Sequence, residues 1–160
     1  MIIKSPNFEN NERIPIWSLN KQIGGKNIMP TLIWQKVNNA QSYALLCIVY
    51  GYQENNFYIN CLLSSIPKNI CELTNISNIN TKHLQYKDTH IQQGKNSENT
   101  YGYIGPLLCQ NEFDFAIEKK YSLNFIIYAL DNIIDVENYE DFEKQIQGHI
   151  LNIGVLTGYF

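Results

Sequence analysis

Histidines and cysteines are the residues from which this sequence could build a nucleophilic or metal-binding centre. His83 and His90 stand seven residues apart in a polar stretch, where solvated loop histidines are expected rather than metal ligands. His149 directly follows Gly148 at the expected end of a helix, where an imidazolium would interact favourably with the last carbonyl groups. No cysteine is near a histidine in the sequence, which disfavours a cysteine-dependent hydrolase. These residues therefore predict no enzyme, no metal site and no cofactor.

The four cysteines are expected to be free thiols. They show no C-x-x-C spacing, and Cys47 and Cys61 lie inside apolar runs, which is typical of buried cysteines rather than of a disulfide framework. The sequence contains no G-x-S-x-G, P-loop or dinucleotide-binding motif. Gly24-Gly25-Lys26 lacks the strand-to-helix context that a phosphate-binding loop requires and is expected to form a turn. The acidic residues of 135–143 are expected to interact with a helix dipole and with solvent. A pair of carboxylates for hydrolysis is therefore not indicated.

The composition describes an ordinary globular protein. The chain has 160 residues, 44% hydrophobic and 17% charged, with a net charge of −3, so residues 1–160 are expected to fold as one domain with its own core. This charge balance gives no electrostatic footprint for nucleic acid or an acidic membrane surface. The first residues lack the apolar region of a signal peptide, and no stretch is long enough to span a membrane. A cytoplasmic protein without nucleic-acid partners or membrane insertion is expected.

Most residues of any functional site in this chain are expected to be positioned by β-strands. Residues 42–50, 57–63 and 121–130 are β-branched and aromatic runs bounded by Gly, Asn or charged residues, and they predict core strands. In residues 151–155 apolar residues alternate with Asn and Gly, which predicts a strand with one face in solvent. Because the strands outnumber the helices and the early ones follow one another without helical patterns between them, antiparallel pairing is expected.

One helix is expected between the last two strands. Asn138 can cap it, Glu140 and Asp141 lie in its positive first turn, and Gly148 follows as a terminating residue. Residues 77–100 are polar and nearly aperiodic, which predicts a long surface excursion of the kind that often lines sites.

Short motifs follow one another along the whole chain. They are Ser5-Pro6-Asn7-Phe8, Ile14-Pro15, Gly25-Lys26-Asn27-Ile28-Met29-Pro30-Thr31-Leu32-Ile33-Trp34, Ser42-Tyr43-Ala44-Leu45, Ile66-Pro67, Gln93-Gly94-Lys95-Asn96-Ser97, Gly102-Tyr103-Ile104-Gly105-Pro106, Tyr128-Ala129-Leu130-Asp131, Gly148-His149-Ile150-Leu151 and Leu156-Thr157-Gly158. In this order the chain resembles the phosphatidylethanolamine-binding protein family, in particular its bacterial branch of Raf kinase inhibitor-like proteins. Met29 stands where that branch usually has Ser. The resemblance implies a mainly β fold, an antiparallel β-sandwich of a large sheet and a second sheet with a few peripheral helices.

The resemblance also implies a ligand pocket, which in the family accepts an anionic head such as phosphate. The family's D-P-D segment falls on Tyr50-Gly51-Tyr52, its pocket His on Asn60 and the following Trp on Cys61, and its H-R pair on Tyr121-Ser122. Only the Gly105-Pro106 turn stands as the family has it. The expected ligand-binding residues are therefore Tyr50, Tyr52, Asn60, Gly105, Pro106 and Tyr121.

These departures replace carboxylates and imidazoles by phenols and an amide, none of which is charged at pH 7. Replacing two His donors costs ~2 kcal/mol, which is roughly thirtyfold in affinity. The resemblance thus implies a non-catalytic binding protein whose uncharged pocket binds phosphoryl ligands weakly or not at all, while a neutral or aromatic small molecule gains from the tyrosines. Alternatively, larger side chains fill the cavity and the fold serves as a ligand-free interaction module for a protein partner, including a second copy of itself.

Overall fold

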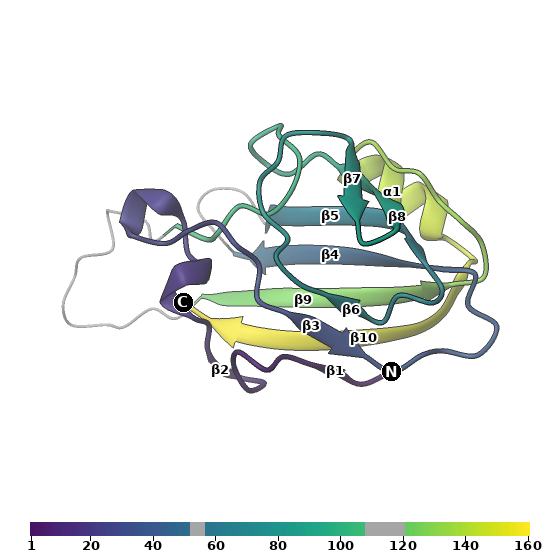
Figure 1. Ribbon diagram of the computed structural model, residues 1–160, viewed down its shortest axis with the longest axis horizontal. Coiled ribbons are helices and arrows are strands. Elements are labelled where there is room, and N and C mark those ends of the chain that lie inside the picture. Colours follow the sequence, from purple (N-terminus) through teal and green to yellow (C-terminus); the bar gives the residue numbers. More distant parts are fainter. Residues whose placement is uncertain (52–56, 108–120) are drawn as a thin grey trace.

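A large β-sheet forms the centre of the structure. The computed structural model describes residues 1–51, 57–107 and 121–160. The strands of this sheet are β2 Glu12–Arg13, β4 Ser42–Tyr50, β5 Phe57–Pro67, β7 His83–Tyr86, β8 Thr89–Gly94, β9 Ser122–Leu130 and β10 Ile150–Tyr159. They lie in the order β2-β10-β9-β4-β5-β8-β7 (Figure 1). Neighbours pair antiparallel, except that β2 pairs parallel with β10.

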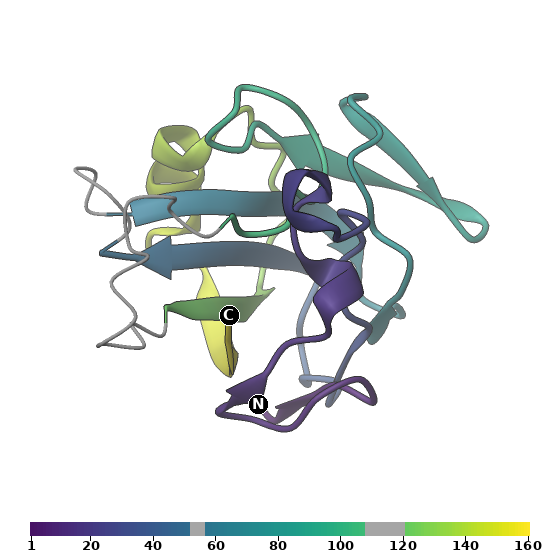
Figure 2. The same cartoon turned by 90° about the vertical axis from the view of Figure 1, so that its left-hand side faces the viewer.

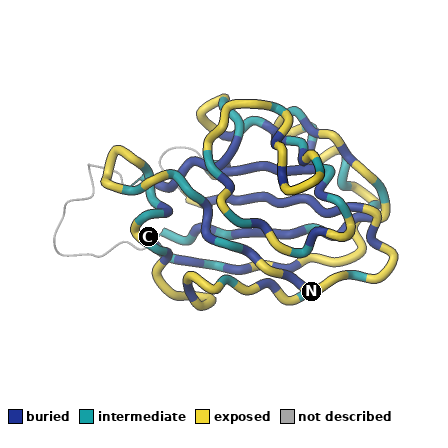
Figure 3. The backbone as a smooth tube through the Cα atoms, viewed as in Figure 1, coloured by how far each residue is buried: buried dark blue, intermediate teal, exposed yellow. Residues whose placement is uncertain are grey.

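The predicted core strands are present close to their predicted bounds. β4 spans the predicted residues, β9 begins at Ser122, and β5 continues to Pro67 beyond the predicted Leu63. β4 is buried from Ser42 to Val49 because it lies between two other strands and both of its faces are covered (Figure 3). A strand covered on both faces needs a nearly continuous apolar run rather than alternation, and residues 42–50 are such a run.

A smaller sheet covers one face of the large sheet. Its strands are β1 Ile3–Lys4, β3 Leu32–Trp34 and β6 Glu72–Leu73, in the order β1-β3-β6. Their inward side chains share one buried cluster with side chains of the large sheet; the cluster includes Ile3, Leu32, Trp34 and Leu73 on one side and Leu45, Cys47, Cys61, Leu63, Phe125 and Ile127 on the other. The mainly β, sandwich-like arrangement expected from the sequence is confirmed.

The helix α1, Tyr139–Ile146, covers the other face of the large sheet. Asn138 caps it by accepting a hydrogen bond from the backbone N–H of Asp141 at 2.9 Å, as predicted. Phe142 is buried against this face, and its ring meets that of Tyr128 edge-on with centroids 5.3 Å apart. Burial raises the pKa of Tyr128 to about 12. Figure 2 shows α1, in yellow-green, on one side of the molecule and the purple N-terminal turns on the other.

The predicted polar excursion over residues 77–100 is wrong in part, because it contains a hairpin. β7 and β8 pair antiparallel at the edge of the large sheet, with Leu84 opposite Ile91. The alternation of exposed and buried residues in β7 is regular, but its sequence, His-Leu-Gln-Tyr, is short. Four residues give too few repeats for a period of two to stand out from a polar background.

Residues 15–29, here called the strap, run along the end of the sheet at which the chain also terminates (Figure 1). The strap contains two short helical turns, η1 Ile16–Ser18 and η2 Lys21–Ile23. Asn20 caps η2, and Gly24 ends it with a φ of 87°, so the predicted turn at the glycine pair is confirmed. Among the helices in the described part of the chain, none is both long and apolar enough to cross a membrane.

Candidate functional site

A pocket of about 380 Å³ lies between the strap, the end of β4 with the start of β5, and the turn at Gly105-Pro106. Apolar side chains form part of its wall, and amides, a phenol and two charged groups form the rest. The residues that line it are Asn20, Lys21, Gln22, Asn27, Val49, Tyr58, Asn60, Glu98, Ile104, Gly105, Pro106 and Leu107.

A β-bulge places Asn60 in this wall. Cys47 pairs with Cys61 and Ile48 with Ile59, so that Asn60 is an extra residue of β5 without a counterpart in β4. An extra residue interrupts the alternation of side chains and re-aims the one that it carries. Ile59 packs in the cluster under α1 while Cys61 belongs to the inner core. Asn60 can therefore join the pocket from a strand position that is otherwise fully buried.

The Asn60 amide is held in one orientation. Its Nδ2 donates to the Ile104 carbonyl oxygen at 2.8 Å, and the backbone N–H of Ile104 donates to the Asn60 carbonyl at 2.9 Å. Exchanging the amide oxygen and nitrogen would bring two acceptors together, so Ile104 fixes which atom points where. The buried Oδ1 atom of Asn60 has no hydrogen-bond partner among the described residues. The pocket wall thus contains a buried and unpaired acceptor.

Close backbone packing between the strap and Gly105 forms the opposite wall. The backbone N–H of Gly105 donates to Asn27 Oδ1 at 3.0 Å, and Asn20 Nδ2 donates to the Gly105 carbonyl at 3.3 Å. A Cβ atom on Gly105 would lie 2.3 Å from the Ser18 carbonyl oxygen. No side chain fits there, which explains sterically why residue 105 of the Gly105-Pro106 motif is glycine.

Two charged side chains, Lys21 and Glu98, also line the pocket. Lys21 stands at the start of η2, and Glu98 lies in the turn that follows β8; both are exposed. The Tyr58 hydroxyl, also in the lining, donates a hydrogen bond to the Glu98 carboxylate. The charges come from segments to which the resemblance assigned no ligand contact, and they are opposite in sign.

Three of the six predicted ligand-binding residues lie together in this pocket, namely Asn60, Gly105 and Pro106. Tyr50 is exposed at the end of β4 and is not among the lining residues. Tyr121 precedes β9, and its ring stacks on that of Phe160 with centroids 5.9 Å apart. Tyr52 lies outside the described residues. The ligand contacts of all six remain predictions.

The core beside the pocket contains groups that stay protonated. Burial raises the pKa of the Cys47 thiol well above its usual value, and the neighbouring Cys61 thiol adds to this effect. Burial also raises the pKa of Tyr103, whose hydroxyl donates to the Ser18 carbonyl at 3.1 Å. Cys47 and Cys61 are free and buried, as predicted, while Cys71 is free and half-buried and Cys109 lies outside the described residues. A protonated thiol is a poor nucleophile, so Cys47 serves packing.

A comparison with protein families decides what this chain is. The family model of the phosphatidylethanolamine-binding protein matches residues 4–160. The chain belongs to this family. No curated protein matches the chain.

Two solved structures share the fold of this family member. YbcL of E. coli, described as a member of the mammalian PEBP family, superposes with a TM-score of 0.82 at 16% identity and covers 99% of this chain and 96% of its own. CT736 of Chlamydia trachomatis, a phosphatidylethanolamine-binding protein homologue, superposes with a TM-score of 0.76 at 20% identity and covers 99% and 95%. At these identities the likeness establishes the fold.

Sequence reasoning missed Lys21 and Glu98 as pocket residues of this family member. The signal for Glu98 was within the Gln93–Ser97 motif, because Asn96 organises the turn that carries it. Asn96 Oδ1 accepts hydrogen bonds from the backbone N–H groups of Glu98 at 3.0 Å and Thr100 at 3.2 Å, and its Nδ2 donates to the Gly102 carbonyl at 3.0 Å. An Asn that winds the following residues into a turn is a recognisable local pattern. No comparable pattern precedes Lys21.

The histidines do not form a site in the described part of the chain. His83 and His90 are exposed on β7 and β8. His149 lies 2.8 Å from a carboxylate oxygen of Asp131 through its Nδ1 atom, so its side chain pairs with an acid rather than with the helix carbonyls that were predicted. Among the residues that the structure describes, no three His, Cys, Asp or Glu side chains gather to hold a metal ion.

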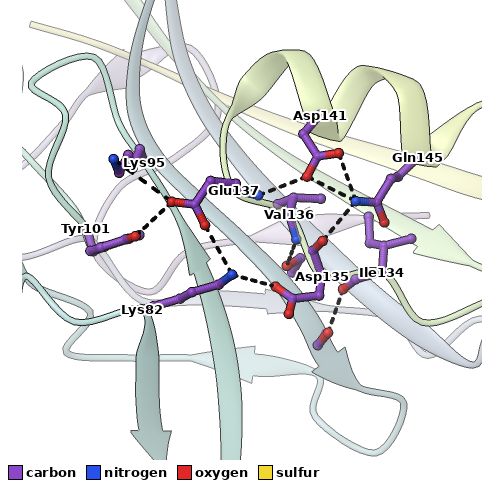
Figure 4. Close-up of polar contacts among 11 residues, drawn as sticks. Lys82, Lys95, Tyr101, Ile134, Asp135, Val136, Glu137, Asp141 and Gln145 are labelled. Carbon is purple, nitrogen blue, oxygen red and sulfur yellow. Dashed lines mark hydrogen bonds and ion pairs between the residues drawn. The ribbon is translucent and has the colours of Figure 1, made fainter.

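A second polar cluster lies away from the pocket, where β8 meets the segment before α1 (Figure 4). Glu137 accepts hydrogen bonds from Lys82 at 3.1 Å and from the Tyr101 hydroxyl at 3.0 Å, and Lys95 lies 4.0 Å away. Asp141 accepts from the backbone N–H of Glu137 at 3.0 Å. Because these carboxylates are already paired, the cluster fastens the β7–β8 hairpin to α1 rather than offering a ligand site.

Acid is expected to weaken this fastening. Lys82 lowers the pKa of Glu137, and Gln145 lowers that of Asp141. A carboxylate whose pKa is lower in the folded state stabilises the protein above the unfolded pKa, about 4.3 for Glu, and this contribution is lost as pH falls through the folded value. Glu137→Gln should therefore lower the free energy of unfolding at pH 6 and have little effect near pH 2.5, as measured by urea denaturation.

The matched control is Glu140→Gln. The Glu140 carboxylate bonds to Lys144 at 3.1 Å on the same helix and is 79% exposed. Exposed pairs of this kind contribute little, so this variant should resemble the wild type at both pH values. An effect of Glu137→Gln that is equal at pH 6 and pH 2.5 would contradict the role of its charge.

Proposed function

We propose that this member of the phosphatidylethanolamine-binding protein family is a non-catalytic binding protein whose pocket takes small molecules and binds phosphoryl groups only weakly. The observation that carries the proposal is the pocket itself, about 380 Å³ in volume, with Asn60 in its wall. An amide oxygen stands there without a partner, where the resemblance implies a histidine. An asparagine amide is uncharged, so it cannot give a phosphoryl oxygen the charge-assisted hydrogen bond that a protonated histidine gives.

The charges around the pocket support weak rather than absent binding of anions. Lys21 is the one cationic side chain among the described lining residues, and Glu98 opposes it in the same lining. Both side chains are exposed, and interactions between exposed charges are worth less than about 1 kcal/mol. A phosphate group therefore gains little from Lys21 and loses part of that gain to Glu98.

Titrations followed by amide NMR shifts test the proposal. Phosphate, phosphoethanolamine and small aromatic compounds would be added to the intact protein, with attention to Asn60, Ile104 and Gly105. Movement confined to these amides with at least one compound, and weak binding of both phosphoryl compounds, is the expected result. No movement with any compound would refute the proposal.

Lys21→Gln should lower the residual affinity for phosphate about threefold, because it removes the cation of the lining at an exposed position. The control is Lys26→Gln, since Lys26 is exposed on the same strap but does not line this pocket. The measurement is the phosphate titration of the Gly105 amide. Equal affinities in the two variants would exclude Lys21 as the anion contact.

A second function is favoured by one surface feature, the exposed apolar side chains of β10. Leu151, Ile153 and Val155 are 41%, 44% and 52% exposed, and β10 lies near the edge of the large sheet. Such a strip suits a protein partner, including a second copy of this chain. Light scattering after size exclusion tests self-association, and a mass that stays monomeric at high concentration would exclude the dimer.

A further inference from the structure

Three sulfur atoms come together in the core between the strap and the centre of the large sheet. The Cys47 thiol of β4 donates a hydrogen bond to the thioether of Met29, the last residue of the strap, with the two sulfur atoms 3.8 Å apart. Cys61 stands opposite Cys47 on β5, and its thiol is hydrogen-bonded to the Cys47 thiol. Each of the three residues is at most 1% exposed. Met29, Cys47 and Cys61, here called the sulfur cluster, therefore contact one another through Cys47 and away from solvent.

The spacing within the sulfur cluster suits a shared metal ion. Two ligand sulfurs that each lie ~2.3 Å from one metal are roughly 3.8–4 Å apart when the geometry is tetrahedral or trigonal. The sulfurs of Cys47 and Met29 have this separation. An ion that binds both of them therefore requires little movement of β4 or of the strap.

The chemistry of the sulfur cluster indicates monovalent copper. Soft thiolate and thioether ligands together select Cu(I), whereas protein zinc sites use Cys, His and carboxylates. Among the buried residues that the structure describes, none is a His, an Asp or a Glu. The buried phenol of Tyr103 already donates to the Ser18 carbonyl at 3.1 Å. The surroundings thus offer sulfur ligands alone.

Binding of Cu(I) leaves no net charge in the core. Cys47 packs as a protonated thiol and becomes a ligand when it loses that proton. Its S–H bond breaks, a sulfur–copper bond forms, and the proton leaves to solvent. The sulfurs of Met29 and Cys61 each donate a lone pair, and Cys61 keeps its proton. One thiolate and one Cu(I) ion sum to zero charge, which avoids the cost of burying an ion in apolar surroundings. The ion arrives and stays as Cu(I), so no electron is transferred.

Met29 also connects the sulfur cluster with a second pocket. This pocket has a volume of about 340 Å³, and Met29 lies in its wall together with Trp17 and Thr31. Because Met29 contacts Cys47 as well, its thioether is the first sulfur that an ion entering from this pocket would meet. The flexible and polarisable Met side chain is suited to such a transfer.

We propose that Met29, Cys47 and Cys61 form a binding site for one Cu(I) ion. The site does not use the residues that line the pocket containing Asn60, so it adds a metal-binding activity to the proposed function and does not depend on it. The sequence predicted no metal site, because Met29 and Cys47 are 18 residues apart in the chain and only the fold brings their sulfurs together.

Titration of the reduced, intact protein with Cu(I) under argon tests the proposal. Bicinchoninate, a chelator that absorbs light when it binds Cu(I), competes for the ion and reports how much the protein holds. The expected result is one tightly held Cu(I) per chain, a higher Tm in its presence and a shift of the Met29 methyl signal in NMR spectra. No uptake of Cu(I), or uptake that leaves this methyl signal unchanged, would overturn the proposal. Zn²⁺ that binds as tightly as Cu(I) would refute the choice of metal.

Two variants remove sulfurs of the site. Met29→Leu keeps the volume of the side chain and removes its sulfur, a type of exchange that cores tolerate well. It should weaken Cu(I) binding at least about tenfold, since even the loss of a group that only supports a ligand weakens metal sites by 10–100-fold. Cys47→Ala removes the sulfur that contacts both others and should abolish binding of one Cu(I) per chain.

The other two thiols of the chain provide the controls. Cys71 is free and half-buried, and Cys109 lies outside the described residues. Cys71→Ala and Cys109→Ala should each bind Cu(I) like the wild type. Loss of the ion in either control, or wild-type affinity in Met29→Leu, would place the copper elsewhere and overturn the site. Met29→Leu decides the question if Cys47→Ala does not fold.

Discussion

Gly105→Ala is expected to destabilise the protein by about 2 kcal/mol and to remove small-molecule binding. An added Cβ would lie 2.3 Å from both the Ser18 carbonyl oxygen and the Leu19 carbonyl carbon, and 2.6 Å from the Asn20 nitrogen. All three are backbone atoms, so no rotamer change relieves the clash, and overpacking of this kind typically costs 1–3 kcal/mol. The strap must move away from the turn, which opens the pocket. Urea denaturation and a titration with phenol measure the two effects.

Gly24→Ala provides the matched control in the same strap. A Cβ on Gly24 would meet nothing within 4 Å, although the φ of 87° is unfavourable for alanine. This left-handed conformation costs about 1 kcal/mol, and the wall of the pocket is not touched. The control should therefore lose some stability and keep its ligand. Loss of binding in Gly24→Ala, or wild-type stability in Gly105→Ala, would contradict the steric account.

Asn60→His is expected to raise the affinity for phenyl phosphate roughly tenfold. The substitution replaces the unpaired acceptor by an imidazole, of which one ring nitrogen can donate to the Ile104 carbonyl that Asn60 Nδ2 now occupies. The other nitrogen donates to an anion when it is protonated. A charge-assisted hydrogen bond is about 1 kcal/mol or more stronger than a neutral one, which corresponds to this gain.

The gain in Asn60→His should depend on pH with a definite sign. Because one ring N–H is engaged by the Ile104 carbonyl, the other nitrogen donates only in the imidazolium form, which an unperturbed histidine adopts below about pH 6.5. The affinity for phenyl phosphate should therefore be higher at pH 5.5 than at pH 8, where the ring is neutral. Calorimetric titration at the two pH values measures this. An affinity of Asn60→His for phenyl phosphate that is the same at pH 5.5 and at pH 8 would refute the role of the imidazolium charge.

Local patterns were sufficient for most of the secondary structure. The strand from Ser42 to Tyr50 and the helix after Asn138 were correctly predicted, because a buried apolar run and an N-cap depend on residues that are close in the chain. The β7–β8 hairpin was not predicted, since its strands are short and polar on one side. There the pairing with β5 decides the conformation.

Residues of the candidate site were predicted only where the sequence could be aligned with motifs of the family. Asn60 and the Gly105-Pro106 turn were identified from aligned motifs, whereas Lys21 and Glu98 were not. A charged surface residue has no periodicity or spacing that marks it as a pocket residue. Its position follows from the path of the strap and of the turn after β8, and neither path can be calculated from the composition of those segments.

The sequence by itself determined the family, the buried strands and the capped helix of this protein, because these depend on residue types and on local order along the chain. Only the tertiary structure decided which way the Asn60 amide faces and which charges meet beside it. The physical reason is that a bulge, a fixed amide and a close backbone approach arise from the pairing of distant segments. The position of Asn60 depends on Cys47 and Ile48 of the neighbouring strand β4, and its orientation depends on Ile104, which follows the β7–β8 hairpin in the chain.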